Sequence, residues 1–257
     1  MKCIAIIPAR WASSRFPGKP LADIGGMPMI ERVYRRAAEA LGPDAVAVAT
    51  DDSRIVATVE AFGGRAILTS DQHRSGTDRC YEAFCTWGVD ADVVINVQGD
   101  EPFVDPRQIR QLADCFTSPD IDIATLVRRF DPALGWDALF NPNTPKVVLD
   151  NDMNALYFSR SIIPYVRGKE WQEWIHSCTF YTHVGMYGYR ADVLAEIVKL
   201  PQSALELAES LEQLRWLSNG YRIRTAVTEY ATVGIDTPDD LQRALKFLNQ
   251  QSEQPDA

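Results

Sequence analysis

Residues 3–21 have the sequence CIAIIPARWASSRFPGKPL, an apolar run that leads directly into a basic segment. The run is rich in β-branched residues and ends at Pro8, and the residues after it include Arg10, Arg15 and Lys19. Continuous apolar runs of this kind are typical of parallel strands that are covered on both faces. The stretch therefore predicts a buried strand whose carboxyl end opens into a basic loop.

The same alternation continues through the first half of the chain. Further apolar runs predict strands at 45–50, 65–69, 92–97 and 122–127. Segments 29–41, 54–62, 77–87 and 106–116 have apolar residues at helical spacing, and Gly42, Gly63 and Gly88 lie where three of these helices should end. Strands that alternate with helices form βαβ units, so we predict an α/β fold with a Rossmann-like, doubly wound sheet.

The pattern changes after about residue 130. Strands are predicted at 146–150, 155–160, 184–190 and 221–228, with long polar loops between them that contain tryptophan. One helix is predicted over 205–220 and a last one over 237–250, with Thr237 as its N-cap. We expect one domain over 1–248, with a smaller mixed α/β extension within 130–230 and a flexible tail at 249–257.

Composition excludes several classes of protein. The chain has 257 residues, 46% of them hydrophobic, and a formal net charge of -9. This length can fill a substantial core, whereas the acidic balance is unfavourable for nucleic-acid or anionic-membrane surfaces, which need a broad basic face. The sequence contains no predicted signal peptide or membrane span, so we expect a cytoplasmic protein without nucleic-acid or membrane partners. The five cysteines include no CxxC pair and are predicted to be reduced core residues.

The basic loop lies where ligands bind in open α/β sheets, beyond the carboxyl ends of the strands. Arg10, Arg15 and Lys19 bring three positive charges within ten residues, enough to balance much of a triphosphate. The loop has neither GxGxxG nor GxxxxGK[ST], so the common phosphate fingerprints do not apply. The alternative is a surface loop with solvated charges.

A carboxylate follows the fourth predicted strand, in the sequence VVINVQGDEPFVDP at 93–106. A parallel sheet would bring Asp100 to the same edge as the basic loop, where it could hold a Mg²⁺ ion that bridges protein and phosphate oxygens. The alternative is a helix-entry turn with acidic residues near a helix N-terminus.

A third candidate, Asp236, lies in TVGIDTPDDL at 232–241, between a short strand and the last predicted helix. From this pattern alone, Asp236 is predicted to be an acidic residue at a helix N-terminus and nothing more.

Short motifs from Ile4 to Leu248 resemble those of the sugar-activating cytidylyltransferases. In chain order they are IIPAR (6–10), PGKPL (17–21), ATD (49–51), SGTDR (75–79), NVQGDEP (96–102), KVVLD (146–150), ALYFSR (155–160), YGYR (187–190), LEQLR (211–215) and GIDTPDDL (234–241). The motifs beyond residue 140 are most similar to those of the enzymes that act on 3-deoxy-manno-octulosonate (Kdo).

The resemblance implies a nucleotidyltransferase fold, a homodimer formed through the extension, and the reaction of CTP with Kdo to give CMP-Kdo and diphosphate for lipopolysaccharide biosynthesis. By matching position, the implied catalytic residues are Lys19, Asp100 and Asp236, of which the two aspartates also ligate Mg²⁺. The implied nucleotide-binding residues are Arg10, Ser13, Arg15, Lys19, Arg79 and Gln98. The implied substrate-binding residues are Gln98, His183, Tyr187 and Glu212.

Two alternative functions remain. A cytidylyltransferase for another sugar acid, such as sialic acid, would share the first loop but not the YGYR and LEQLR motifs. A noncatalytic module that binds sugar nucleotides would be expected to lack part of the charged set. Arg10, Lys19, Asp100 and Asp236 are all present, which favours an enzyme.

Overall fold

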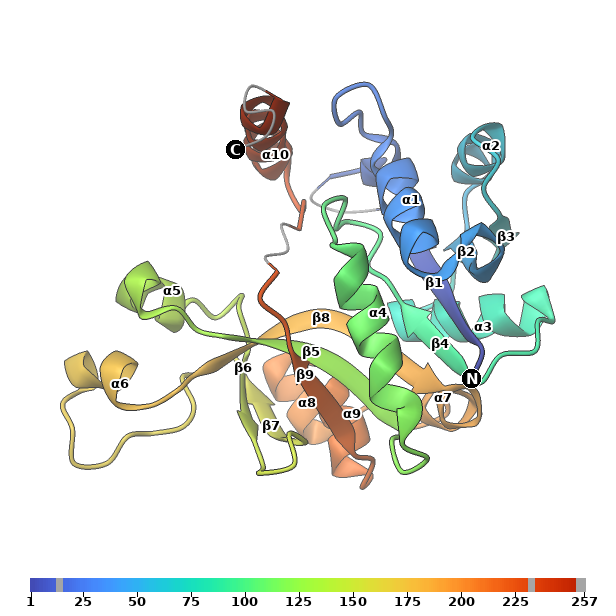
Figure 1. Ribbon diagram of the computed structural model, residues 1–257. Coiled ribbons are helices and arrows are strands. Elements are labelled where there is room, and N and C mark those ends of the chain that lie inside the picture. The colour runs from blue at the N-terminus through green and yellow to red at the C-terminus, as the bar shows by residue number, and fades with distance from the viewer. Residues whose placement is uncertain (13–15, 231–233, 253–257) are drawn as a thin grey trace. The chain divides into compact units, whose positions relative to one another are not determined.

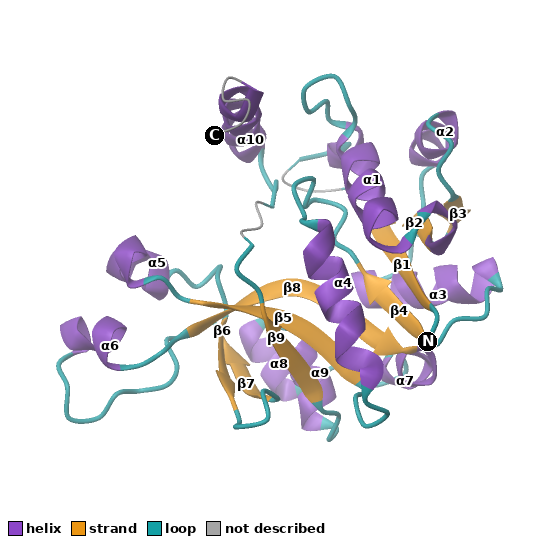
Figure 2. Cartoon of the chain, viewed as in Figure 1, coloured by secondary structure: helices purple, strands orange, loops and turns teal. Residues whose placement is uncertain are grey.

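The computed structural model describes residues 1–12, 16–230 and 234–252. Its helices and strands are labelled in Figure 1 and coloured by type in Figure 2. The chain divides into two compact parts: unit 1, which comprises Met1–Arg110 and Tyr230–Ala257, and unit 2, which comprises Gln111–Glu229. The C-terminal segment therefore belongs to the same unit as the basic loop.

Unit 1 is built on a parallel sheet in which the strands follow the order β3-β2-β1-β4. The strands are β1 Cys3–Ala9, β2 Val46–Thr50, β3 Ala66–Leu68 and β4 Val93–Asn96. Every residue of β2 and β4 is buried, as expected for apolar strands that are covered on both faces. The predicted α/β class and the first four predicted strands are confirmed.

The helices of unit 1 follow the strands in sequence. They are α1 Met29–Leu41, α2 Ser53–Ala61, α3 Gly76–Trp87, α4 Pro106–Asp114, which extends into unit 2, and α10 Pro238–Ser252. Short 3₁₀ turns occur at Lys19–Leu21 and Pro43–Ala45, and another follows α4 in unit 2 at Cys115–Thr117. Ile235 and Ala244 form a buried cluster with Ile24 and Met29, which anchors the segment that carries Asp236.

Unit 2 contains a mixed sheet centred on β5, Ile123–Arg129. β5 pairs antiparallel with β8 (Tyr181–Arg190) and parallel with β9 (Ile223–Val227). β6 (Lys146–Leu149) pairs antiparallel with β8 and with β7 (Ala155–Ser159). The fifth apolar run is therefore a strand, as predicted, but it has one antiparallel neighbour.

The helices of unit 2 are α5 Gly135–Phe140, α6 Trp171–Ser177, α7 Ala191–Ile197, α8 Ala204–Glu209 and α9 Gln213–Ser218, with a 3₁₀ turn at Pro132–Leu134. α5 and α6 lie in segments that we predicted as loops. Their aromatic side chains contact each other, with the rings of Trp136 and Trp171 5.0 Å apart. Among the described residues, no helix is long and apolar enough to cross a membrane.

The prediction of one continuous helix over 205–220 is wrong. α8 ends at Glu209, Ser210 has a left-handed φ of 51°, and α9 begins at Gln213. Arg160 donates hydrogen bonds to the carbonyl oxygens of Glu209 and Ser210, at 2.6 and 3.2 Å. An arginine thus occupies acceptors that the next turn of an uninterrupted helix would use.

The prediction that the cysteines are core residues is also wrong for four of the five. Cys80 is buried, Cys85 is exposed, and Cys3, Cys115 and Cys178 are half-buried. Cys80 and Cys85 are both in α3, and a separation of five residues places them on different faces of a helix.

Candidate active site

A cavity of about 270 Å³ opens in unit 1 beyond the carboxyl ends of β1 and β4. Its walls are formed by segments that are far apart in sequence: residues 8–10, 19–20, 73–76 and 98–100, together with Arg79 and Asp236. The parallel sheet explains this convergence, because the carboxyl ends of β1 and β4 lie at one edge.

Two glycines allow the strand ends to approach closely. A Cβ atom at Gly99 would lie 2.7 Å from the carbonyl oxygen of Pro8, so no side chain fits there. A Cβ atom at Gly76 would lie 3.3 Å from the ring of Pro8. The QGDEP segment and the start of α3 therefore both pack closely against the end of β1.

Lys19 joins the two acidic candidates in the cavity wall. Its Nζ atom donates to Asp100 Oδ2 at 2.7 Å and to Asp236 Oδ1 at 3.1 Å. The Lys19 side chain is 13% exposed, whereas those of Asp100 and Asp236 are 33% and 47% exposed. Three residues that are more than 80 positions apart in sequence, 19, 100 and 236, thus form one ion-paired cluster.

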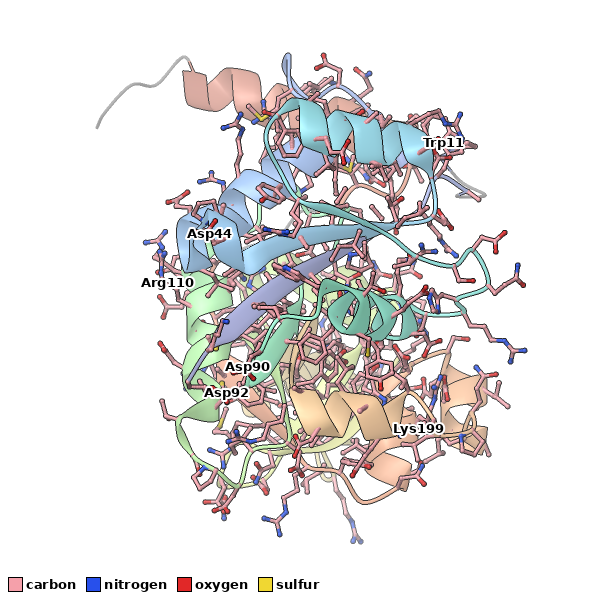
Figure 3. The ribbon with its side chains drawn as sticks, turned by 90° about the vertical axis from the view of Figure 1, so that its right-hand side faces the viewer. Trp11, Asp44, Asp90, Asp92, Arg110 and Lys199 are labelled. Atoms are coloured by element: carbon pink, nitrogen blue, oxygen red, sulfur yellow. The ribbon has the colours of Figure 1, made fainter. Side chains whose placement is uncertain are left out.

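The basic loop is closed by backbone and aromatic contacts. Gly18 has a left-handed φ of 71°, and its N–H donates to the carbonyl oxygen of Trp11 at 3.1 Å. The indole ring of Trp11, labelled in Figure 3, lies under the guanidinium of Arg54 at 3.4 Å. Arg10 lines the cavity, whereas Ser13 and Arg15 lie outside the described residues.

The carboxylate pair is suited to a magnesium ion. The oxygen atoms of Asp100 and Asp236 converge on one ammonium group, and carboxylate oxygens are ligands that Mg²⁺ prefers. Magnesium is commonly held by one or two carboxylates, with water and phosphate completing its shell. Within the described residues no group of three or more His, Cys, Asp or Glu side chains is arranged to hold a metal, so these two would need substrate oxygens.

Asp236 is fixed by the turn that begins α10. The carboxylate of Asp240 accepts from the backbone N–H groups of Asp236 and Thr237, at 3.1 and 2.8 Å. The hydroxyl of Thr237 accepts from the N–H of Asp240 at 3.2 Å, which confirms Thr237 as the N-cap. The acid that accepts from the backbone at the start of α10 is therefore Asp240, whereas Asp236, which the local pattern predicted in that role, contacts Lys19.

Glu101 differs sharply from its neighbour Asp100. Burial, and then the charge of Asp100, raise the pKa of Glu101 to about 8. Its Oε2 atom is buried and has no hydrogen-bond partner among the described residues. The DEP motif thus contains one accessible carboxylate and one carboxyl group that is neutral at pH 7.

The two other predicted nucleotide-binding residues of unit 1 also line the cavity. Arg79 is buried in α3, where its guanidinium donates to Asp51 and to Thr69, both at 2.8 Å. Gln98 follows β4, and its amide lies 3.5 Å from Asn96 Oδ1. Arg79 therefore has an intramolecular acid that compensates its charge.

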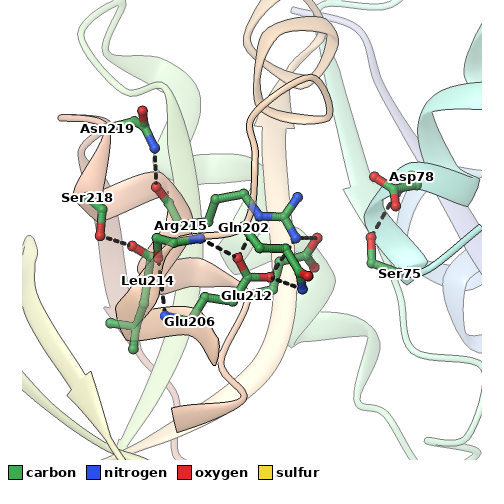
Figure 4. Close-up of polar contacts among 10 residues, drawn as sticks. Ser75, Asp78, Gln202, Glu206, Glu212, Leu214, Arg215, Ser218 and Asn219 are labelled. Atoms are coloured by element: carbon green, nitrogen blue, oxygen red, sulfur yellow. Dashed lines mark hydrogen bonds and ion pairs between the residues drawn. The ribbon is translucent and has the colours of Figure 1, made fainter. Parts of the chain in front are cut away.

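Sequence reasoning missed the start of α3 as part of the cavity wall. His73, Arg74, Ser75 and Gly76 all line it. Ser75 is the N-cap of α3 and accepts from the N–H of Asp78 at 3.1 Å (Figure 4). The available signal was the SGTDR motif after the third strand, because that position lies at the ligand-binding edge of a parallel sheet.

His183 and Tyr187 form a second cluster in unit 2, and the charge of Glu212 acts on Tyr187. His183 and Tyr187 are both on β8, with ring centroids 5.3 Å apart. The Thr125 hydroxyl, at a bulge in β5, lies 3.0 Å from His183 Nε2 and 2.8 Å from the Met186 carbonyl oxygen. A hydroxyl that donates to that carbonyl accepts from Nε2–H, which leaves Nδ1 of His183 as an acceptor.

Burial sets the protonation states of this second cluster. It lowers the pKa of His183 to about 3, so the imidazole is neutral at pH 7. Burial, followed by the charges of Tyr189 and Glu212, raises the pKa of Tyr187 well above its usual value. Tyr187 therefore keeps its hydroxyl proton.

Comparison with known proteins identifies the family. A family model described as cytidylyltransferase matches residues 4–223. The 3-deoxy-manno-octulosonate cytidylyltransferase of Parabacteroides distasonis is 61% identical over 249 residues, which cover 96% of this chain and 98% of that protein. The protein of the same name from Phocaeicola vulgatus is 58% identical over 250 residues, 97% of this chain and 98% of its own.

A solved structure agrees with these relatives and confirms the predicted nucleotidyltransferase fold. It is that of a CMP:2-keto-3-deoxy-manno-octonic acid synthetase complexed with CTP, with a TM-score of 0.89 and 45% identity. The match covers 98% of this chain and all of the solved one. The chain therefore belongs to the cytidylyltransferase family and, within it, to the 3-deoxy-manno-octulosonate cytidylyltransferases.

Proposed function

We propose that this protein transfers the cytidylyl group of CTP to Kdo, giving CMP-Kdo and diphosphate. The proposal rests on the cluster of Lys19 with Asp100 and Asp236 in the wall of the unit 1 cavity. The identity of 61% to a protein named 3-deoxy-manno-octulosonate cytidylyltransferase supports the same reaction.

Charge repulsion is the main obstacle to this reaction. Kdo is a sugar acid, and its anomeric hydroxyl must attack an α-phosphate that is also negative. The hydroxyl loses its proton and forms an O–P bond, while the bond from the α-phosphorus to the bridging oxygen breaks and the electron pair leaves with diphosphate. Positioning and compensation of charge are therefore the main catalytic requirements, and no covalent enzyme intermediate is needed.

We assign the charge compensation to unit 1. Arg10 and Lys19 would bind phosphate oxygens, since both line the cavity and carry fixed positive charge. Asp100 and Asp236 would hold a magnesium ion, which when bound would neutralise phosphate charge. Gln98 and Arg79 line the same cavity, and we assign them to the nucleotide.

We assign the sugar to the cluster of unit 2. Kdo carries several hydroxyl groups, which need acceptors as well as donors. His183 is neutral at pH 7 because burial lowers its pKa to about 3, so it can accept a hydrogen bond through Nδ1. The protonated hydroxyl of Tyr187 can donate, and the carboxylate of Glu212 can accept.

The decisive experiment measures diphosphate release by the purified chain with CTP and Mg²⁺. The sugar is Kdo, sialic acid or none. We expect release with Kdo, little with sialic acid, and none after chelation of the metal. Release with sialic acid but not Kdo would assign the protein to the alternative sugar acid. CTP binding without release, by a folded chain, would support a noncatalytic module.

We also propose a cytoplasmic homodimer, as the resemblance implies. Light scattering during gel filtration measures the mass directly, against 28.8 kDa for one chain. A monomer at micromolar concentration with full activity would contradict this proposal.

A further inference from the structure

The corner between α8 and α9 contains a buried ion pair that the proposed reaction does not use directly. Arg215 donates to both carboxylate oxygens of Glu206, from Nε at 2.8 Å and from Nη2 at 2.6 Å (Figure 4). The two side chains are 9% and 7% exposed. A two-point contact of this kind fixes the plane of the guanidinium as well as its position.

Glu206 is itself held rigidly. It forms a capping box with Ser203 at the start of α8, and it accepts from the amide of Gln202 at 3.3 Å. Burial alone would raise the pKa of Glu206, but the hydrogen bonds from Arg215, Gln202 and the Ser203 backbone hold it below the usual value. Glu206 is therefore an anion at neutral pH, and its hydrogen bonds fix its orientation.

The same guanidinium also faces the predicted sugar ligand Glu212. Arg215 Nη2 lies 3.8 Å from Glu212 Oε1, a distance at which the charges attract each other. Glu206 engages the guanidinium at two points within 2.8 Å, whereas the distance from Nη2 to Glu212 Oε1 is longer. Arg215 thus attracts Glu212 while its guanidinium is fixed by the two-point contact with Glu206.

The break at Ser210 makes this arrangement possible. In one continuous helix, residues 206 and 215 would be separated by about 13 Å along the axis and would lie on opposite faces. The break brings them into contact instead. Trp216 then packs edge-on against Tyr187 and Tyr189, with centroid distances of 5.1 and 5.5 Å, which ties α9 to the strand that carries His183.

We propose that Glu206 and Arg215 are positioning residues that orient Glu212 toward the sugar acid. The inference rests on the proposed function, because it treats Glu212 as a ligand of Kdo. Glu206 keeps the guanidinium in place, and the guanidinium fixes the direction of the Glu212 carboxylate. Without Glu206, Arg215 would turn toward the nearby carboxylate of Glu212 and would draw it into a closer ion pair.

The test compares KM for Kdo with KM for CTP in the diphosphate-release assay. We expect Glu206→Gln to raise KM for Kdo about tenfold, with KM for CTP and kcat within about twofold of the wild type. Arg215→Lys keeps the charge but loses the planar fork, so it should raise KM for Kdo in the same selective way. Gln202→Ala is the matched control, because it removes another hydrogen bond to Glu206 and leaves Arg215 untouched.

A second comparison shows whether the effect passes through Glu212. In a Glu212→Gln background, adding Glu206→Gln should change KM for Kdo no further. A rise that persists in that background, an equal rise of both KM values, or an unchanged KM for Kdo in folded variants would each overturn the inference. If Glu206→Gln does not fold by circular dichroism, Arg215→Lys decides by the same criteria. Absence of turnover by the wild type would instead refute the proposed function.

Discussion

Units 1 and 2 each contain a cluster of candidate ligands, and the two clusters differ in chemistry. The unit 1 cluster consists of ionised groups, and its carboxylates remain 33% and 47% exposed. In the unit 2 cluster, burial keeps His183 and Tyr187 uncharged. A polyphosphate needs compensating charge, whereas sugar hydroxyls need neutral donors and acceptors that are shielded from water. Burial, as well as residue type, therefore decides which substrate a cluster can bind.

We expect the largest loss of turnover when a charged side chain of the unit 1 cluster is replaced. Asp100→Asn and Asp236→Asn should each fold normally and lose Mg²⁺-dependent turnover by about a hundredfold or more, because a metal ligand and a stabiliser of developing charge are lost together. Turnover is measured at saturating Mg²⁺. The exposed Asp90, labelled in Figure 3, offers Asp90→Asn as a control. Near-native turnover in either variant would show that the residue is not a metal ligand.

Lys19 is the cation that balances these two carboxylates. Lys19→Ala should lower kcat/KM for CTP by about 2 to 4 kcal/mol of transition-state stabilisation, roughly 30- to 900-fold. The exposed Lys199 provides Lys199→Ala as a control for loss of a positive charge. An unchanged kcat/KM would mean that the basic loop is a surface loop with solvated charges, which is the alternative interpretation of its sequence.

In unit 2 the comparison predicts a smaller and selective effect. His183→Phe keeps the ring contacts with Phe158 and Tyr187, at 5.1 and 5.3 Å, and removes the ring nitrogens. The hydrogen bond from Nδ1 to the sugar is lost together with the Nε2 bond to Thr125, so KM for Kdo should rise about tenfold while KM for CTP stays unchanged. His176, exposed on α6, provides His176→Phe as a control. A rise in KM for CTP of the same size would mean that His183 does not belong to a separate sugar cluster.

The two clusters also differ in how far the sequence predicted them. Lys19 and Asp100 follow buried parallel strands, and such strand ends meet at one edge, so local pattern and topology were enough to bring them together. His183 and Tyr187 lie within a strand, and Glu212 lies at a helix break that the periodicity of 205–220 did not indicate. Only the family resemblance pointed to them. Arg160, which is 50 residues from Ser210, donates to the carbonyl oxygens at this break, and a contact of that range leaves no mark on local propensity.

Glu101 is the exception within unit 1, because its carboxyl group is neutral at pH 7 whereas its neighbour Asp100 is ion-paired with Lys19. Its pKa in the folded protein is about 8, raised first by burial and then by Asp100, against an ordinary value of 4.5. Between these values the folded state holds a proton that the unfolded state has lost. Stability from this group is therefore fully present below pH 4.5 and is lost as pH rises through about 8.

Glu101→Gln should remove this pH dependence with little effect on turnover at pH 7, because an amide is neutral at every pH. We expect the free energy of unfolding of the wild type to fall by on the order of a few kcal/mol relative to the variant between pH 5 and 9. Urea unfolding at both pH values measures the difference, with Glu60→Gln, at an exposed position of α2, as the control. If the free energy of unfolding changed equally with pH in the wild type and in Glu101→Gln, Glu101 would be ionised in the folded protein. Unit 1 would then contain a further negative charge beside Asp100, and its contrast with the uncharged His183 and Tyr187 of unit 2 would be sharper than burial alone predicts.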